Sequence, residues 1–190
     1  LLLYILLMKI IITENQLKRL IIESEDRSDG TKLIASQNFW DWLRWHEGNP
    51  TEKGEPLLKA YKDITGVWTI GYGHTGKEAY AGNVISKSKA NELFIEDVNE
   101  AAKCVKRFLN SWKEKNHEGY RLKLNEYESL ISLVFNSGCD GVRTSDFTQK
   151  LKRGNYDDAA ELIKTYKSKR LKNRRNVEYE LFKNGNYIKE

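Results

Sequence analysis

The sequence predicts an α+β protein in which a helix and a β-hairpin precede a larger helical region. Three patterns carry this prediction. Apolar residues recur at helical spacing just before Gly48, β-branched and apolar residues flank a turn at Gly66, and helical periodicity continues from Ser86 almost to the C-terminus. The 190 residues suit one domain with a short appendage, which we place at residues 31–190 and 1–30.

The N-terminal extension contains one predicted amphipathic helix, residues 13–24, and a polar, turn-rich segment from Glu25 to Gly30 that we interpret as a linker. Residues 1–12 are apolar but are interrupted by Lys9, and they lack the basic region and cleavage site of a secretory signal. We favour translation from Met8 over a weak export or anchor signal, and we expect no stable insertion into a membrane.

The first part of the main domain combines a helix with a hairpin. Gly48 is a good C-cap residue for the helix, and Pro50 lies just beyond it. A polar loop from Asn49 to Pro56 follows. The next two segments, LLKAYKD and VWTIGYG, flank the turn at residues 64–66 and therefore predict a β-hairpin.

The remainder of the chain is predicted to be helical. Ser86 is the expected N-cap of a long helix. Asn125 is the expected cap of the next helix, which Gly138 closes. Three shorter helices are expected near residues 145–153, 156–168 and 170–184.

Composition limits the classes of protein that this chain can represent. Its 21 aromatic residues argue against long disorder, and 13 Gly and 2 Pro without a repeat exclude a collagen-like chain. The net charge is +5, and residues 149–190 hold 12 Lys and Arg against 6 Asp and Glu, a balance of +6. This favours a polyanionic partner, which can be nucleic acid, a membrane surface or an anionic cell-wall polymer.

The cysteines and histidines suggest neither a disulfide framework nor a metal site. Cys104 and Cys139 lie far apart, and His46, His74 and His117 show no ligand spacing with them. We therefore predict free thiols and synthesis in a reducing cytosol.

Residues 45–75 contain the groups that cleavage of a bond between two sugars requires. Such cleavage needs one carboxyl group that holds a proton near neutral pH and a second, ionised carboxylate that orients water or acts as a nucleophile. Glu47 suits the first role, because Trp42 and Trp45 precede it on one helix and desolvation raises the pKa of a carboxyl group. Asp63 suits the second, because it begins a turn that offers hydrogen-bond donors.

Other residues of the predicted hairpin fit the same chemistry. Thr69 lies six residues after Asp63, where its hydroxyl can share a water molecule with that carboxylate. Gly71 and Gly73 leave bare backbone where a bulky polymer approaches, and His74 follows them. Each residue alone also has an ordinary structural explanation, such as turn chemistry for the aspartate and strand propensity for the threonine.

These residues resemble motifs of the phage-type lysozyme family, the muramidases and endolysins typified by the lysozyme of T-even bacteriophages. In that family a Glu-Gly ends the first helix, an Ala-Tyr-x-Asp strand follows, and Gly-x-x-Thr-Ile-Gly-x-Gly-His forms a hairpin. Glu47-Gly48, residues 60–63 and residues 66–74 hold these places. The resemblance covers residues 38–184, with weaker matches in the same order at 84–86, 97–98, 130–138, 155–160 and 173–182.

The resemblance implies a lysozyme-like fold, with a small antiparallel hairpin lobe, a larger helical lobe and an active-site cleft between them. It also implies inverting hydrolysis of the β-1,4 bond between N-acetylmuramic acid and N-acetylglucosamine in peptidoglycan. Glu47 would be the general acid, Asp63 would activate water, and Thr69 would help to hold that water. No metal or cofactor is implied.

The resemblance also implies roles around this centre. Thr75, Phe135 and Asn136 would bind substrate, His74 would be structural, and Arg174 would pair with the catalytic glutamate or steady the cleft. The basic C-terminal region would steer the protein toward an anionic wall. We expect a monomer that stays in the host cytoplasm until lysis and then acts on peptidoglycan.

The sequence departs from the family in one place. Fifteen residues separate Glu47 from Asp63, more than the family usually has, and we interpret Asn49 to Pro56 as a loop insertion. Glu55 and Glu52 are therefore alternative acids. Both lie in the polar loop without a helix or aromatic shelter, so we favour Glu47.

Three other functions are alternatives to lysozyme activity for this sequence. A lytic transglycosylase on a similar fold needs one glutamate and no water-activating partner, so Asp63 and Thr69 count against it. A non-catalytic wall-binding or virion protein would not need all three candidate residues. Nucleic-acid binding through residues 149–190 lacks a recognised motif with interleaved aromatics.

Overall fold

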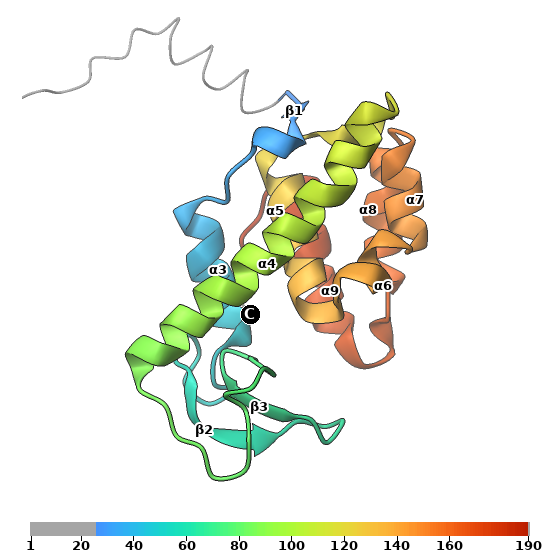
Figure 1. The fold of residues 1–190 in the computed structure, drawn as a ribbon. Helices are drawn as coiled ribbons and strands as arrows, with labels where there is room; N and C mark the ends of the chain where they lie inside the picture. The colour runs from blue at the N-terminus through green and yellow to red at the C-terminus, as the bar shows by residue number, and fades with distance from the viewer. Residues whose placement is uncertain (1–25, 190) are drawn as a thin grey trace, which may run out of the picture.

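The computed structural model describes residues 26–189 of the chain. Its elements are, in order, β1 (Ser28–Asp29), η1 (Gly30–Lys32), α3 (Gln37–Glu47), β2 (Leu57–Lys62), β3 (Trp68–Gly71), α4 (Lys87–Glu114), η2 (Glu118–Tyr120), β4 (Arg121–Leu122), α5 (Leu124–Ser137), α6 (Cys139–Arg143), α7 (Asp146–Lys152), α8 (Tyr156–Thr165) and α9 (Ser168–Asn184). The hairpin of β2 and β3 forms a small lobe, and most helices gather in a larger lobe (Figure 1).

The small lobe is an antiparallel hairpin with its own apolar contacts. Tyr61 pairs with Thr69 across the two strands. Ala60 and Ile70 point to one side of the hairpin and pack with Leu93 of α4 in a small cluster. This sheet is too small to be stable alone, so its attachment to α4 fixes its position.

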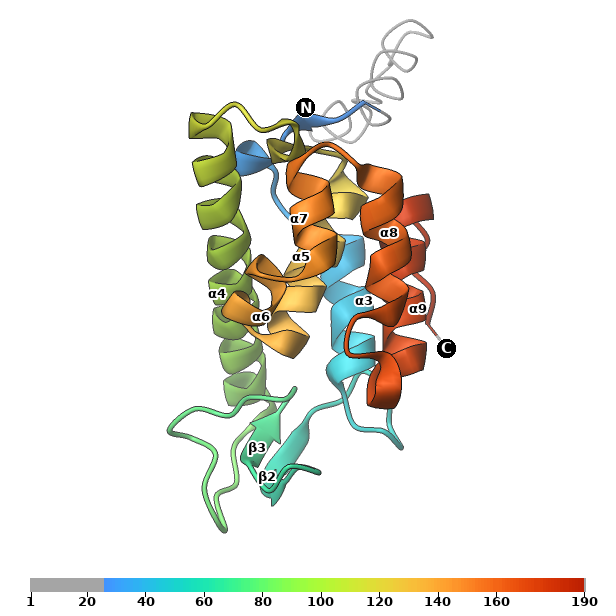
Figure 2. The same cartoon turned by 90° about the vertical axis from the view of Figure 1, so that its right-hand side faces the viewer.

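The long helix α4 joins the two lobes, as the side view in Figure 2 shows. Its 28 residues span about 42 Å at 1.5 Å per residue. Phe94 lies in the first half of α4 and contacts Tyr72 of the hairpin segment at 4.9 Å and Phe135 of α5 at 5.9 Å between ring centroids. This aromatic contact ties the lobes together, and truncating such a buried ring typically costs about 3–5 kcal/mol.

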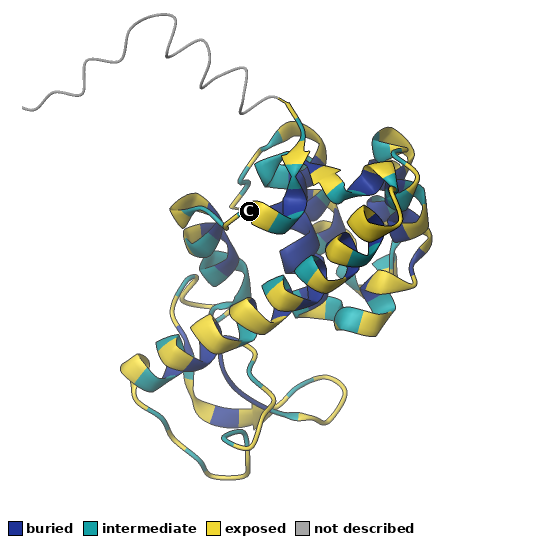
Figure 3. Cartoon of the chain, turned by 45° about the horizontal axis from the view of Figure 1, so that its top comes forward, coloured by how far each residue is buried: buried dark blue, intermediate teal, exposed yellow. Residues whose placement is uncertain are grey.

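The core of the larger lobe surrounds α5. Buried residues concentrate where the helices face one another (Figure 3). Leu130 and Ile131 are completely buried, and so are the polar residues Ser129 and Ser132 on the same helix. Both hydroxyl groups donate hydrogen bonds to residue Glu178 of α9, which satisfies their burial.

Most of the helices and strands predicted from sequence are confirmed. Gly48 is the C-cap of α3, Ser86 is the N-cap of α4 and Gly138 is the C-cap of α5. Gly138 has φ 79°, a backbone angle that favours glycine. The predicted hairpin is β2 and β3, and the three predicted short helices correspond to α7, α8 and α9.

The predicted cap at Asn125 is wrong. The N-cap of α5 is Lys123, and Asn125 lies inside the first turn. Its side chain instead donates hydrogen bonds to the carbonyl oxygens of Leu181 and Phe182, at 2.9 and 2.8 Å. Asn125 therefore caps the end of α9, a long-range role that its local sequence does not reveal.

Part of the predicted linker is also packed structure. Ser28 and Asp29 form β1, which pairs with β4. Arg27 donates to the buried carboxylate of Glu126 at 2.6 Å and lies over the ring of Tyr156. The predicted helix at residues 13–24 lies outside the described residues, and the domain boundary near residue 30 stays a prediction.

The prediction of free thiols is wrong. Cys104 of α4 and Cys139 at the start of α6 form a disulfide, with Cα atoms 6.0 Å apart. Gly138 separates α5 from α6, and Cys139, the first residue of α6, meets the buried Cys104 of α4. The inference of a reducing cytosol from free thiols falls with that prediction, because disulfides persist in oxidising compartments.

Within residues 26–189 we find no helix with both the length and the apolar character to span a membrane. In the same range, no three His, Cys, Asp or Glu side chains are grouped so that they could hold a metal ion.

Candidate active site

The helix α3 carries Glu47 as its last residue. Ser36 caps the helix start, its Oγ accepting from the backbone N–H of Phe39 at 3.2 Å. Trp42 is completely buried, and its indole N–H donates to the carbonyl oxygen of Ile188 at 2.8 Å. The core and the C-terminal segment therefore fix this helix, and with it the position of the Glu47 carboxyl group.

The Glu47 side chain is enclosed, with 14% of its surface exposed. A terminal nitrogen of Arg174 lies 2.5 Å from its Oε1. On the hairpin side, a Cβ placed on Gly73 would stand 3.8 Å from its Oε2, an ordinary van der Waals distance, so the Gly73 backbone lies close to the acid. The Arg174 guanidinium also lies 5.5 Å from the centre of the Trp42 ring. Arg174 and Trp42 thus form one wall around the acid.

Burial is the main reason why the pKa of Glu47 is raised above its ordinary value. Arg174 opposes this effect by favouring the ionised carboxylate, while the negative charge of Glu178 adds to it. The net result is a carboxyl group that retains its proton to higher pH than a solvated glutamate. That property is what a general acid requires.

Asp63 lies at the hairpin turn directly after β2. Its Oδ1 accepts hydrogen bonds from the Thr65 hydroxyl at 2.7 Å, the Thr65 N–H at 2.8 Å and the Val67 N–H at 2.9 Å. These bonds, the Thr65 hydroxyl first, lower the pKa of Asp63. Its other oxygen, Oδ2, accepts none of the three bonds, so the ionised group can still bind water.

Tyr61 and Thr69 lie beside the two carboxyl groups. Burial raises the pKa of Tyr61, and the negative charges of Asp63 and Glu47 add to this effect. The Thr69 hydroxyl donates to the carbonyl oxygen of Val67 at 3.2 Å, and that oxygen also accepts from the Asp63 N–H. The threonine is therefore tied to the Asp63 turn through one shared acceptor.

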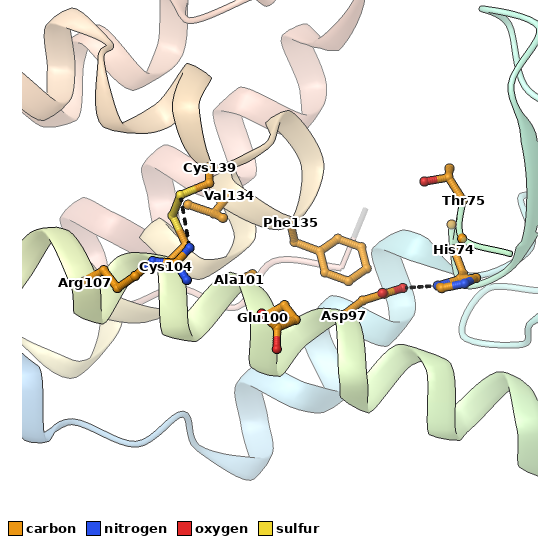
Figure 4. Close-up of a pocket in the computed structure, with 12 residues that line it drawn as sticks. His74, Thr75, Asp97, Glu100, Ala101, Cys104, Arg107, Val134, Phe135 and Cys139 are labelled. Atoms are coloured by element: carbon orange, nitrogen blue, oxygen red, sulfur yellow. Dashed lines mark hydrogen bonds and ion pairs between the residues drawn. A yellow bond between two sulfur atoms is a disulfide. The ribbon is translucent and has the colours of Figure 1, made fainter.

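An open pocket of about 460 Å³ adjoins this centre at Gly73. Its walls come from the hairpin exit, from α4 and from the end of α5 (Figure 4). Thr75 lines it from the hairpin exit and Phe135 from α5, whereas Asn136 does not line it. Instead Asn136 is exposed, and its Oδ1 accepts a hydrogen bond from Arg175 at 2.7 Å.

His74 connects the hairpin to α4. Its Nδ1 lies 2.9 Å from Asp97 Oδ2, and its Nε2 lies 3.1 Å from Glu78 Oε2, so both ring nitrogens face carboxylates (Figure 4 draws the Asp97 contact). Only 12% of the His74 side chain is exposed. These contacts explain the presence of His74 by a structural role, without a role in catalysis.

The alternative acids lie in different surroundings. Glu52 and Glu55 are both exposed in the loop before β2. Glu55 pairs with Lys87 at 2.6 Å, and its backbone carbonyl accepts from the Asn49 N–H. The loop is thus an ordered surface feature, and neither glutamate has the enclosure of Glu47.

Sequence reasoning named Arg174 as a partner of Glu47 but missed Glu178 and Arg175, which lie behind it. Glu178 is completely buried and accepts from Arg174 Nε at 3.0 Å, and it pairs with the buried Arg175. The signal was present, because residues i, i+3 and i+4 share one helix face. Arg174 and Glu178 therefore face the same way, and Leu181 continues that buried face.

Comparison with known proteins gives the family. Residues 55–178 match the Phage lysozyme family. The endolysin of Acyrthosiphon pisum secondary endosymbiont phage 1 is 37% identical over 113 residues, which are 59% of this chain and 70% of that protein. The SAR-endolysin of Enterobacteria phage P21 is 30% identical over 127 residues, 64% of this chain and 72% of that protein.

A solved structure agrees on the fold. The endolysin from Escherichia coli O157:H7 phage FAHEc1 has a TM-score of 0.65 at 24% identity, with 83% of this chain and 98% of that chain covered. The hairpin lobe, the bridging helix and the helical lobe are therefore a lysozyme-like α+β fold, as predicted. The chain belongs to the phage lysozyme family, because the family match covers more than half of its length. Glu47 precedes the matched segment, so its selection rests on its surroundings.

Proposed function

We infer that this protein is a lysozyme, a glycoside hydrolase that cleaves the β-1,4 bond between N-acetylmuramic acid and N-acetylglucosamine in peptidoglycan. The observation that carries the inference is the contrast between two carboxyl groups whose charges both act on Tyr61. Glu47 is enclosed and its pKa is raised, whereas Asp63 is held by turn donors and its pKa is lowered. Two carboxyl groups with pKa values moved apart supply an acid and a base at one pH.

Each carboxyl group then has one task. Glu47 donates its proton to the leaving glycosidic oxygen, and Asp63 accepts a proton from the attacking water. Activity requires Asp63 ionised, so it falls when pH drops through the lowered pKa of that residue. It also requires Glu47 protonated, so it falls when pH rises through the raised pKa of the acid. The pH–rate profile is therefore bell-shaped.

We assign Thr69 to hold the attacking water together with Asp63. Its hydroxyl hydrogen is committed to the Val67 carbonyl, so its oxygen remains available to accept a hydrogen bond from water. Water that attacks from the face opposite the leaving group inverts the anomeric carbon. Proton NMR of the first-formed reducing sugar tests this outcome, since inversion at a β-linkage releases the α-anomer first.

The remaining residues bind or support. Thr75 and Phe135 line the pocket beside the acid and offer a hydroxyl and an aromatic face to sugar. Asn136 presents its amide at the end of α5, where Arg175 fixes its oxygen. His74 holds the hairpin against α4, and Arg174 holds Glu47.

Product analysis in heavy-oxygen water tests the reaction class. A lysozyme acting on purified peptidoglycan releases muropeptides whose new reducing end carries the heavy oxygen. A lytic transglycosylase, the alternative enzyme, releases unlabelled 1,6-anhydro products, because a hydroxyl of the sugar attacks instead of water. A non-catalytic wall-binding protein sediments with peptidoglycan and releases nothing.

We also propose a location and an assembly state. The protein acts on the cell wall as a monomer, and it remains in the host cytoplasm until lysis. The disulfide between Cys104 and Cys139 would then close on the oxidising side of the membrane. Thiol trapping before and after lysis tests this sequence of events, and light scattering of the purified protein tests the monomer.

A further inference from the structure

A buried row of alternating charges stands behind the acid, formed by Glu47, Arg174, Glu178 and Arg175, which we call the charge row. Arg174 lies 2.5 Å from Glu47 and donates to Glu178 Oε1 at 3.0 Å. Arg175 pairs with the other oxygen of Glu178. Glu178 and Arg175 have no exposed surface, and the Arg174 side chain is 10% exposed.

We propose that Glu178 is a positioning residue for the glycosidase reaction, which aims the Arg174 guanidinium at Glu47 and offsets its charge so that the acid keeps the proton it donates. This inference rests on the proposed function. Glu178 does not touch the substrate cleft, so it acts through Arg174.

The hydrogen bonds around Glu178 fix Arg174 in one orientation. Ser132 of α5 donates to Glu178 Oε1 at 2.7 Å and accepts from an Arg174 terminal nitrogen at 3.0 Å. The guanidinium is thus held through its Nε and Nη2, and the same Nη2 faces Glu47. An arginine without these partners could turn and bind the Glu47 carboxylate through two nitrogens, which would favour the ionised form.

Charge balance gives the second part of the role. Two arginines facing one acid would strongly favour ionised Glu47, because buried opposite charges attract. Glu178 supplies a second negative charge, so the row is neutral when Glu47 is ionised and carries one positive charge when it is protonated. Consistent with this, Glu178 raises the pKa of Glu47, whereas Arg174 and Arg175 lower it.

The other groups around Glu47 do not replace Glu178. On its own helix, burial lowers the pKa of His46 to about 4, so that ring is neutral at the pH of interest. On the hairpin, burial raises the pKa of Tyr61, and the negative charges of Asp63 and Glu47 raise it further. The loop before the hairpin brings Lys53 near His46, and this lysine is exposed. Glu178 is therefore the buried negative charge of the row that opposes the two arginines.

The same residue also connects the acid to the end of α5. Arg175, which Glu178 pairs, donates to Asn136 Oδ1 at 2.7 Å and to the Ser137 hydroxyl at 2.8 Å. These two residues end α5 beside the pocket. A merely structural role for the charge row is therefore a serious alternative, and the test must separate it from an effect on the acid.

The test compares pH–rate profiles on purified peptidoglycan for Glu178→Gln, Arg175→Gln and the double variant. We expect Glu178→Gln to move the alkaline limb, set by Glu47, to lower pH by about half a unit or more. Arg175→Gln should move it to higher pH, and the double variant should lie between the two. The acid limb, set by Asp63, should stay in place in all three variants and serves as the internal control.

A structural role predicts something different. It lowers the rate by the same factor at every pH, so an unmoved alkaline limb in folded Glu178→Gln overturns the proposal. If Glu178→Gln alone does not fold, the comparison is made in the Arg175→Gln background. The alkaline limb of the double variant must then lie at lower pH than that of Arg175→Gln alone. If the two limbs lie at the same pH, the proposal is overturned.

A second measurement needs no activity. Carbon-13 NMR titration of the side-chain carboxyl group of Glu47, with its signal identified by its loss in Glu47→Gln, must show the same ordering of variants. If the wild type released no products from peptidoglycan, the proposed function would fail, yet this titration would still decide whether Glu178 controls the proton on Glu47.

Discussion

Two regions of the molecule hold the same chemical group in opposite surroundings. We call them the helical wall, which is the end of α3 with Arg174 of α9, and the hairpin wall, which is the turn after β2. On the helical wall, Glu47 lies enclosed against Arg174, and its pKa is raised by burial. On the hairpin wall, Asp63 lies at a turn, and donors from Thr65 and Val67 lower its pKa. One wall favours the protonated form of a carboxyl group and the other favours the ionised form.

The difference shows two ways of setting a pKa. The donors to Asp63 lie within four residues of it, so a short turn sequence creates that environment. The groups that act on Glu47 come from α9, far away in the chain, and they depend on the packing of α9 against α5. The pKa of Asp63 can therefore be changed by substitutions in its own turn. The pKa of Glu47 instead depends on packing throughout the larger lobe.

The largest expected effect is the loss of the acid. Glu47→Gln keeps the shape of the side chain but removes the proton donor, so turnover of purified peptidoglycan should fall by about 10³–10⁴-fold. Circular dichroism should show a folded protein. Substantial activity in the folded variant would mean that another group donates the proton.

Removing the ionised partner should have a somewhat smaller effect. Asp63→Asn keeps an oxygen that can accept the turn hydrogen bonds, so the fold should persist, while turnover should fall by about 10²–10³-fold. The measurement is release of reducing ends from peptidoglycan. If Asp63→Asn stays fully active while Glu47→Gln is inactive, the chemistry uses one carboxyl group and the transglycosylase alternative gains support.

The next prediction concerns the stability of the helical wall. Cys104→Ala with Cys139→Ala opens a covalent loop with a sequence separation of 35, and it should lower the free energy of unfolding by about 2–4 kcal/mol. Urea denaturation measures this change. Reductant should destabilise the wild type to a similar degree and leave the double variant unaffected, whereas equal stability of all samples would contradict a disulfide in solution.

The smallest expected effect tests the choice of acid. Glu55→Gln removes an exposed ion pair with Lys87, and water screens such pairs, so the fold should be unaffected. Turnover should change by less than about twofold, since this glutamate lacks the enclosure that raises a carboxyl pKa. A loss of activity as large as that of Glu47→Gln would mean that Glu55, in the loop, is the general acid.

Local patterns in the sequence were sufficient for most of the fold. The caps at Ser86 and Gly138 and the turn after Asp63 each depend on residues within a few positions, and the structure has them where the sequence predicts. The predicted cap at Asn125 was wrong because the Asn125 side chain binds the end of α9 and not its own helix. Its partner is close in space but distant in sequence.

The candidate site shows the same division. The aspartate and the threonine of the hairpin are recognisable from spacing, and the structure brings them to one turn network. The disulfide between Cys104 and Cys139 and the buried pair of Glu178 and Arg175 could not be read from spacing alone. They require knowledge of which helices pack together.

The sequence by itself determined the α+β order of a helix, a hairpin and a larger helical region, because helical and strand periodicity, caps and turns act over short distances. The lysozyme-like arrangement came from the resemblance of its motifs to the phage-type lysozyme family. Only the tertiary structure decided the direction of the pKa shift of Glu47, which residues surround its side chain and whether Cys104 and Cys139 form a disulfide. The physical reason is that burial and charge pairing depend on distances between helices, and packing of the whole chain sets those distances.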